Sequence, residues 1–332
     1  MTPTLLAVAH GSRDPNALRT VTPLLERVRR LRPGLPVRLG HIELNEPLLG
    51  DVLAGLRGQV VLVPLLLGRG HHVKVDLPAA ALAAPHLSVR VAAPLGPHPL
   101  LAEALAARLV EAGWPPLDPP APDPSTHEQG LCGRDLSGQP LTDPSAPEQP
   151  ISRRPFPASP RSGRPLLGRS LLGPSTVLAA RPADPGHPAR RAADPHRTGV
   201  VLAAAGSRDP HSAEDTGRTA GLLSARLGGV PVRPGYASAT GPGAPSVTEA
   251  VAALAARGCR RVAVAAYFTA PGRFAAQCAA EAAEAAADLG MSTSVAAAPL
   301  GDQRAMARLV LHRYERALVS APLSHPAVTV GV

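Results

Sequence analysis

The sequence is short of aromatic residues and of cysteines. Its 332 residues include three Phe, three Tyr, one Trp and three Cys. So few aromatic rings leave little surface on which nucleic-acid bases would stack, and the arginines form no dense basic run, so nucleic acid is not an expected partner. The cysteines Cys132, Cys259 and Cys278 are odd in number, widely spaced and form no CxxC pair. This pattern argues against a disulfide framework and against a thiolate zinc site, and it favours a reducing compartment.

Long hydrophobic runs are also missing. The longest apolar stretch, VVLVPLLL, is far shorter than the roughly 20 residues that span a bilayer, and the N-terminus has no basic flank followed by a long apolar segment. We therefore expect a soluble, cytoplasmic protein without membrane contact. The formal net charge of +9 favours an anionic partner, which composition alone leaves open between nucleic acid, a membrane surface and a polycarboxylate ligand.

The apolar residues that are present, mainly Ala, Leu and Val, follow a regular alternation. Strand-like runs such as TLLAVAH, QVVLVPLLL and LSVRVAAPL alternate with helix-like stretches, and the alternation resumes in the C-terminal part with GVVLAAAGS and RRVAVAAYFT. Continuous aliphatic strands separated by helices are typical of a parallel sheet covered on both faces. The sequence predicts an α/β protein with two similar doubly wound parallel sheets, related by a pseudo-twofold axis.

The domain organisation follows from a change in composition. Residues 1–114 form the first predicted domain, and 199–320 form the second, degenerate one. Between them, 115–198 hold nearly half of the 40 prolines, among Ser, Asp, Arg and Gly. Such a composition buries too little apolar surface to fold, so this segment is predicted to be a disordered linker, and 321–332 a tail. Because both halves lie in one chain, a monomer is expected.

The two halves are recognisable as copies by one phrase. AHGSRDP, which begins at residue 9, returns as AAGSRDP from residue 204, with Ala205 in place of His10. The copies are offset by 195 residues at this phrase. We align the third strands with an offset of 201, Val61 against Val262, and assign the difference to the loop ATGPGAPS. The histidine survives in one copy only, which predicts that the chemistry belongs to the N-terminal half.

Three ionisable residues follow the first three predicted strands of that half: His10, Glu43 and His72. In a parallel sheet these strand ends share one edge, where ligands bind. Imidazole suits divalent Fe, Co, Ni and Zn, and two or three protein ligands leave coordination positions open for a metal in transit. A strand-end histidine taken alone is more often a hydrogen-bonded structural residue. Here all three are missing from the second copy, where the alignment has Ala205, Ser238 and Arg273.

Other polar residues near these strands have structural explanations. Ser12 or Asp14 is predicted to cap the following helix, with Pro15 in its first turn, although that helix N-terminus and Arg13 would also receive a carboxylate. Asp76 is predicted to be a helix cap rather than a catalytic acid. Four further histidines are predicted to be structural or exposed: His41, His71, His86 and His98.

The segments AHGSRDP, IELNEP and GRGHHVKVDLP closely resemble those of the sirohydrochlorin chelatases of the class II, ATP-independent chelatase family. The resemblance is strong over 1–113 and weaker over 199–319. It implies a lyase that inserts a divalent ion into sirohydrochlorin, a tetrapyrrole with eight carboxylates, releases two protons from ring nitrogens and uses no nucleotide.

The resemblance also implies roles for individual residues. His10 and His72 map onto the metal-binding histidines, with His71 second to His72, and Glu43 maps onto the family's glutamate. His10 or Glu43 would accept the pyrrole protons. Ser12 and a set of basic residues are expected to bind the substrate carboxylates. These basic residues are Arg13, Arg69, Lys74, Arg208 and Arg273.

Several alternatives stay open at this point. Fe²⁺ insertion for siroheme is the expected reaction, and Co²⁺ insertion for cobalamin is the first alternative, because imidazole and carboxylate ligands do not separate the two ions. A non-enzymatic metal or tetrapyrrole carrier is the second. Histidine phosphatases have an RHG motif that resembles AHG here, but Ala9 replaces the arginine that would hold phosphate, which makes that activity the least expected.

Overall fold

The computed structural model describes residues 2–114, 197–238 and 244–319. The predicted tail lies outside these residues, and so does the predicted linker except for its last two positions. Within the described ranges, no helix is long and apolar enough to cross a membrane.

The N-terminal half is a four-stranded sheet in which all paired neighbours run parallel, in the order β2-β1-β3-β4. Its helices connect the strands in the usual crossover manner. In chain order the elements are β1 (Thr4–Ala9), α1 (Pro15–Leu31), β2 (Val37–His41), α2 (Leu49–Gly55), β3 (Gly58–Pro64), the π-helical turn η1 (His72–Asp76), α3 (Leu77–Leu82), β4 (Leu87–Val91) and α4 (Pro99–Glu111).

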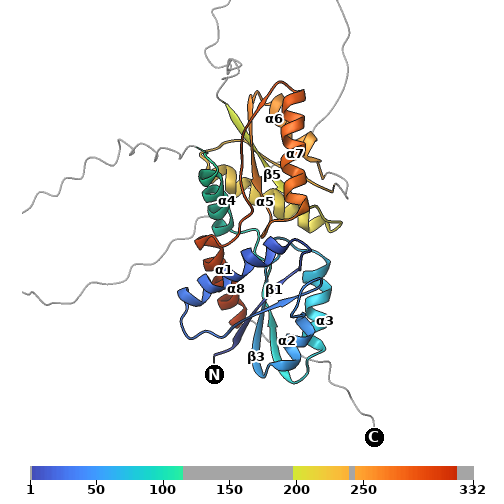
Figure 1. The fold of residues 1–332 in the computed structure, drawn as a ribbon, viewed down its shortest axis with the longest axis vertical. Helices are drawn as coiled ribbons and strands as arrows, with labels where there is room; N and C mark the ends of the chain where they lie inside the picture. The colour runs from blue at the N-terminus through green and yellow to red at the C-terminus, as the bar shows by residue number, and fades with distance from the viewer. Residues whose placement is uncertain (1, 115–196, 239–243, 320–332) are drawn as a thin grey trace, which may run out of the picture. The chain divides into compact units, whose positions relative to one another are not determined.

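The C-terminal half repeats this plan, with a parallel sheet in the order β6-β5-β7-β8. The predicted fold class, two similar parallel sheets with flanking helices, is confirmed (Figure 1). The elements are β5 (Thr198–Ala204), α5 (Pro210–Arg226), β6 (Val232–Tyr236), α6 (Val247–Ala256), β7 (Arg261–Ala266), α7 (Arg273–Asp288), β8 (Ser292–Ala296) and α8 (Arg304–Leu318).

The central strands are buried on both faces, which explains their continuous aliphatic sequences. In β1, Leu5 and Ala7 belong to one hydrophobic cluster, whereas Leu6 and Val8 belong to another, and all four are fully buried. Because successive side chains of a strand point to opposite faces, an unbroken apolar run supplies two separate cores.

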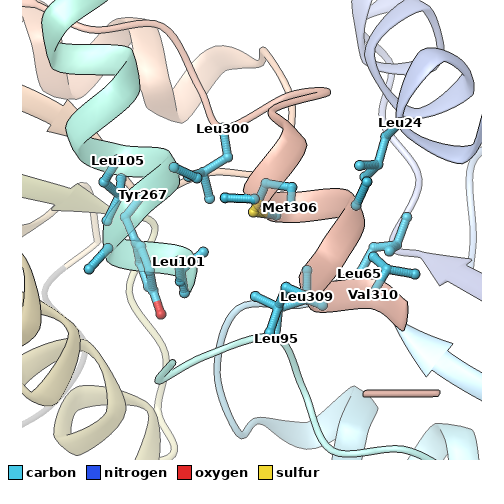
Figure 2. Close-up of a cluster of buried hydrophobic side chains, with 14 of the residues drawn as sticks. Leu24, Leu65, Leu95, Leu101, Leu105, Tyr267, Leu300, Met306, Leu309 and Val310 are labelled. Atoms are coloured by element: carbon cyan, nitrogen blue, oxygen red, sulfur yellow. The ribbon is translucent and has the colours of Figure 1, made fainter. Parts of the chain in front are cut away.

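The last helix of each half packs against the sheet of the other half. Helix α4 contacts α5 and β7, whereas α8 contacts α1, β3 and β4 (Figure 1). Figure 2 shows Met306, Leu309 and Val310 of α8 in the same cluster as Leu24 of α1 and Leu101 of α4. The two halves therefore share one core, and neither half encloses this part of its core with its own helices alone.

Strand pairing corrects the alignment of the two copies by one residue. Leu5 of β1 pairs with Val61, and Val200, at the equivalent position of β5, pairs with Ala263. The counterpart of Val61 is therefore Ala263 and not Val262. Val61 and Ala263 face the shared core, whereas Val262 faces the opposite side of its sheet. The prediction was wrong because nothing in two aliphatic strands marks their register, and a one-residue shift exchanges the faces.

A π-helical turn accounts for the remaining one-residue difference. Beyond η1, the first fully buried residues of the two following helices are Leu77 and Cys278, which are again 201 positions apart. A π turn holds one more residue than an α turn, and such single turns are frequent at functional sites. The extra residue falls in the turn that begins with His72.

Because α8 packs on the sheet of the opposite half, shortening one of its buried side chains is predicted to lower the free energy of unfolding strongly. Leu309 is fully buried in the shared core, so Leu309→Ala is expected to lower the free energy of unfolding by about 2–5 kcal/mol. Leu31→Ala, at an exposed position near the end of α1, is the matched control and should cost well under half as much. Urea denaturation of both variants measures this, and equal effects would contradict the shared core.

A second prediction concerns pH and His98, whose Nδ1 accepts a hydrogen bond from the backbone N–H of Leu100 (3.1 Å) at the start of α4. Burial, and then the positive charges of Arg313 and His312, lower the pKa of His98 below 6.5. The unfolded chain therefore takes up the proton first, and stability should fall as the pH drops below about 6.5.

His98→Asn keeps a capping side chain and removes the titrating group. We expect the decrease in unfolding free energy between pH 7 and pH 5 to become smaller in this variant. Chemical denaturation at a series of pH values tests this, and an unchanged slope would show that His98 does not contribute.

Candidate functional site

The structure brings His10, Glu43 and His72 together at the carboxyl edge of the first sheet. The ring centroids of His10 and His72 are 4.7 Å apart, with the rings at 88° to each other. His10 Nδ1 lies 3.5 Å from Glu43 Oε1. The side chains of His10 and His72 are 43% and 35% exposed, so both rings reach solvent rather than being buried among aliphatic neighbours. Three side chains separated by about 60 residues in sequence thus share one exposed site.

His72 is held by a residue predicted to have a different role. Its Nδ1 lies 2.6 Å from Asp76 Oδ2, four residues along the turn. Asp76 was predicted to cap the following helix, but its side chain makes no capping hydrogen bond, so that prediction is wrong. The carboxylate turns back to the histidine because the π turn places the two side chains on one face. A carboxylate on Nδ1 favours the tautomer with a proton there and leaves Nε2 free as a ligand.

The Nδ1 atom of His10, like that of His72, lies beside hydrogen-bond acceptors. Its Nδ1 lies 3.3 Å from the carbonyl oxygen of Gly11, as well as near Glu43, so acceptors surround this nitrogen and Nε2 remains available. His71 is more peripheral, with a side chain that is 72% exposed and a longer contact of 3.6 Å to Asp76. Of the two adjacent histidines, His72 is the one in ring contact with His10.

The backbone around this site is the same in both halves. Gly11 has a φ of +104°, and a Cβ there would lie 1.8 Å from the carbonyl oxygen of Glu43. Gly206 has a φ of +94°, with a Cβ 2.0 Å from the carbonyl oxygen of Ser238. Only glycine fits such a turn. The halves therefore differ at this edge in their side chains, because Ala205 and Ser238 occupy the places of His10 and Glu43.

The GSRDP phrase is structural in both copies, as predicted. Asp14 Oδ1 accepts a hydrogen bond from the N–H of Asn16 (2.9 Å), and Asp209 Oδ1 accepts one from the N–H of His211 (3.0 Å). The N–H of Ser12 donates to Asn45 Oδ1 (2.7 Å). Sequence reasoning missed Asn45, whose only signal was its place in IELNEP beside Glu43.

A cleft of about 420 Å³ opens beside His10, between α1 of the first half and the segment after β7 of the second. Two of its apolar residues are unusually exposed: Leu44 at 51% and Phe274 at 38%. Leu44 also has a φ of +68°, a backbone conformation that costs energy for a branched residue and is typical of functional sites. Sequence analysis missed both residues. The lining includes His10, Ser12, Arg13, Leu18, Leu44, Asn45, Phe268, Arg273 and Phe274.

The predicted substrate-binding residues fall into two groups. Ser12, Arg13 and Arg273 line the cleft, and the guanidinium carbon of Arg273 lies 5.2 Å from the ring centroid of Phe274. The other three residues do not line the cleft. Arg69 is paired with carboxylates of α5, and Lys74 is paired with Asp209, the residue that caps α5. Arg208 is exposed.

The acidic partners of these two residues belong to the second half. Arg69 is paired with Asp215 and Glu214, which raises the pKa of Arg69. Lys74 lies 2.5 Å from Asp209 Oδ2 and lowers the pKa of Asp209 to about 2. Both cations are thus already neutralised by neighbours.

No cluster of three or more His, Cys, Asp or Glu side chains with metal-binding geometry occurs within the described residues. If His10 and His72 bind an ion, two imidazoles would fill only part of its coordination sphere. Such a site suits an ion that is passed on better than one held permanently.

The CbiX family profile matches residues 4–112 and 199–317, which is most of the chain and both halves. The protein belongs to the CbiX family.

Curated relatives carry one functional name. A sirohydrochlorin cobaltochelatase of Methanosarcina barkeri is 33% identical over 78 residues, which are 22% of this chain and 60% of that protein. The sirohydrochlorin cobaltochelatase of Methanosarcina acetivorans is 27% identical over 123 residues, 32% of this chain and 95% of that protein. The chain thus spans less than two thirds of the first relative, and the match to the second covers about one third of this chain.

Solved structures share the whole two-half fold. SirB from Bacillus subtilis with Fe³⁺ superposes with a TM-score of 0.60 at 17% identity, covering 96% of both chains. SirB from Bacillus subtilis subspecies spizizenii in complex with cobalt gives 0.58 at 17% identity, again with 96% coverage of both. At this identity the likeness establishes the fold.

The paired glycine turns allow a matched test of the site. Gly11→Ala and Gly206→Ala are each expected to lower the free energy of unfolding by more than about 1 kcal/mol, because the added methyl group meets a carbonyl oxygen. Only Gly11→Ala should also weaken Co²⁺ binding, since it displaces His10 and Glu43. Calorimetric titration with Co²⁺ beside urea denaturation measures both effects, and equal loss of Co²⁺ binding in the two variants would contradict a site confined to the first half.

Proposed function

We propose that this protein is a sirohydrochlorin chelatase, which inserts a divalent ion into a metal-free tetrapyrrole without nucleotide. The observation that carries the proposal is the edge-to-face pair of His10 and His72, with the Nδ1 of each ring beside an acceptor. His10 of this pair also lines the cleft, together with Arg13 and Arg273. Membership of the CbiX family and the names of the curated relatives agree with this activity.

The metal ion is a substrate, held by the Nε2 atoms of His10 and His72. Two neutral imidazoles displace some of the ion's water but leave most of its coordination positions to solvent or to an incoming ligand. A tetrapyrrole with four ring nitrogens would then complete and finally replace this coordination. The low number of protein ligands is what allows the ion to leave.

The cleft would bind the tetrapyrrole through both apolar side chains and arginines. Leu44 and Phe274 offer exposed apolar surface to the macrocycle, and Arg13 and Arg273 offer donors to carboxylates on its rim. As two metal–nitrogen bonds form, the two ring N–H groups release their protons. Glu43, 3.5 Å from His10, is the proposed acceptor and passes the protons to water through its exposed carboxylate.

Fe²⁺ is the ion proposed first, as for siroheme synthesis, and Co²⁺ is the second candidate. The imidazole pair suits both ions. The relatives are named cobaltochelatases, which favours Co²⁺, whereas the two SirB structures were obtained with Fe³⁺ and with cobalt. We propose a monomeric, cytoplasmic enzyme whose anionic substrate accounts for the chain's positive charge.

The test is an anaerobic spectrophotometric assay with sirohydrochlorin and either Fe²⁺ or Co²⁺. We expect many turnovers for the wild-type protein and a decrease of at least about 100-fold in His10→Ala and His72→Ala, because each removes one of two ligands. His71→Ala is the matched control beside the site and should keep most of the activity.

Three outcomes would contradict this function. Conversion that stops at one equivalent per protein would indicate a carrier. Unchanged rates in His10→Ala and His72→Ala would exclude the histidine pair as the site. Release of phosphate from an aryl phosphate, abolished in His10→Ala, would support a histidine phosphatase instead.

A further inference from the structure

The two halves meet at two pseudo-equivalent junctions. In each, the segment that follows the third strand of one half faces the start of the first helix of the other. The first junction joins residues 65–74, after β3, to the start of α5. The second joins residues 267–275, after β7, to the start of α1, and it contains the cleft. The repeated fold makes the two comparable residue by residue.

The first junction is closed by a buried carboxylate. Asp215 of α5, whose side chain is only 1% exposed, accepts three hydrogen bonds from Arg69. The donors are the backbone N–H of Arg69 (3.1 Å), its Nε (2.9 Å) and a terminal guanidinium nitrogen (2.5 Å). Glu214 adds a contact of 3.2 Å. Asp215 thereby fixes both the main chain and the side chain three residues before His72.

Further contacts hold the same segment on both sides of His72. Lys74 is paired with Asp209 (2.5 Å). The hydroxyl of Tyr267 donates to the carbonyl oxygen of Leu67 (3.1 Å), and a Cβ at Gly68 would lie 3.3 Å from Ser212 Oγ. The second half therefore contacts the segment before and after His72.

The second junction lacks these contacts. Aligned through the repeat, Thr20 stands in the place of Asp215, Arg19 in that of Glu214, and Pro271 in that of Arg69. No carboxylate–arginine pair can form with these residues. The first junction, next to the turn that begins at His72, is held by the Arg69–Asp215 ion pair. The second junction, which contains the cleft, has no such pair at the equivalent positions.

We propose that Asp215, acting through Arg69, is a positioning residue for His72: the second half has lost the ligands but supplies the carboxylate that holds the metal-binding turn of the first. This rests on the proposed role of His72 as a ligand. The turn depends on outside contacts because none of the residues of η1, from His72 to Asp76, is buried. Without Asp215 the segment would keep the contacts of Leu67 and Lys74 but would hold His72 less firmly relative to His10.

The experiment measures binding of Co²⁺ alone to the full-length protein, by calorimetric titration and by the visible absorption of bound Co²⁺. Asp215→Asn is expected to weaken Co²⁺ binding about tenfold, as loss of a residue that orients a ligand does, and to change the Co²⁺ spectrum. Asp302→Asn is the matched control, because Asp302 pairs with Arg27 (3.1 Å) across the halves but away from the histidine turn. It should leave Co²⁺ binding unchanged.

A double variant separates positioning from general damage. In the His72→Ala background, Asp215→Asn should cause no further loss of Co²⁺ affinity, since the ligand on which it acts is gone. Arg69→Lys, which keeps the charge but loses the two-pronged contact, should also weaken binding and serves if Asp215→Asn does not fold.

The outcomes distinguish this inference from the proposed function. A wild-type protein that binds no Co²⁺ would refute the histidine site itself. If the wild type binds and His72→Ala weakens binding, three results would overturn the role of Asp215. They are unchanged binding in Asp215→Asn, an equal loss in Asp302→Asn, and a further loss when Asp215→Asn is added to His72→Ala.

Discussion

The packing of α4 and α8, each against the sheet of the opposite half, is the constraint on which the other features of this structure depend. Leu309 and Met306 of α8 are fully buried in the cluster that also contains Leu24 and Leu101. Because each last helix completes the core of the opposite half, the two sheets cannot separate without exposing apolar surface to water. Both the closed junction at Asp215 and the open cleft at His10 exist because this core holds the halves together.

The two halves illustrate how a duplicated unit divides its tasks. The backbone around Gly11 and Gly206 is almost identical, down to the close approach of a carbonyl oxygen, and the capping aspartates are present in both. What differs is the chemistry of a few side chains. The first half carries the imidazoles and Glu43, whereas the second contributes Phe274 and Arg273 to the cleft and Asp215 to the junction.

The basic residues near the site differ in whether a carboxylate already neutralises them. Arg69 and Lys74 are predicted from the sequence to bind substrate, yet Arg69 is neutralised by Asp215 of α5 and Lys74 by Asp209, the N-cap residue of α5. Arg13 and Arg273 remain exposed in the cleft. A cation already paired with a carboxylate has little left to offer a ligand, so Arg13 and Arg273 suit the proposed anionic substrate better than Arg69 and Lys74 do.

The sequence by itself determined the parallel α/β halves, the repeat, the capping role of Asp14 and the placement of His10 and His72 after the first and third strands of one sheet. These follow from local patterns: aliphatic runs, turn residues and a phrase repeated with one change. Tertiary structure alone decided the packing of α4 and α8 on the opposite sheets, the register of Ala263 and the pairing of Arg69 with Asp215. Each of these depends on which segment packs against which, and residues far apart in sequence leave no local signal of their contact.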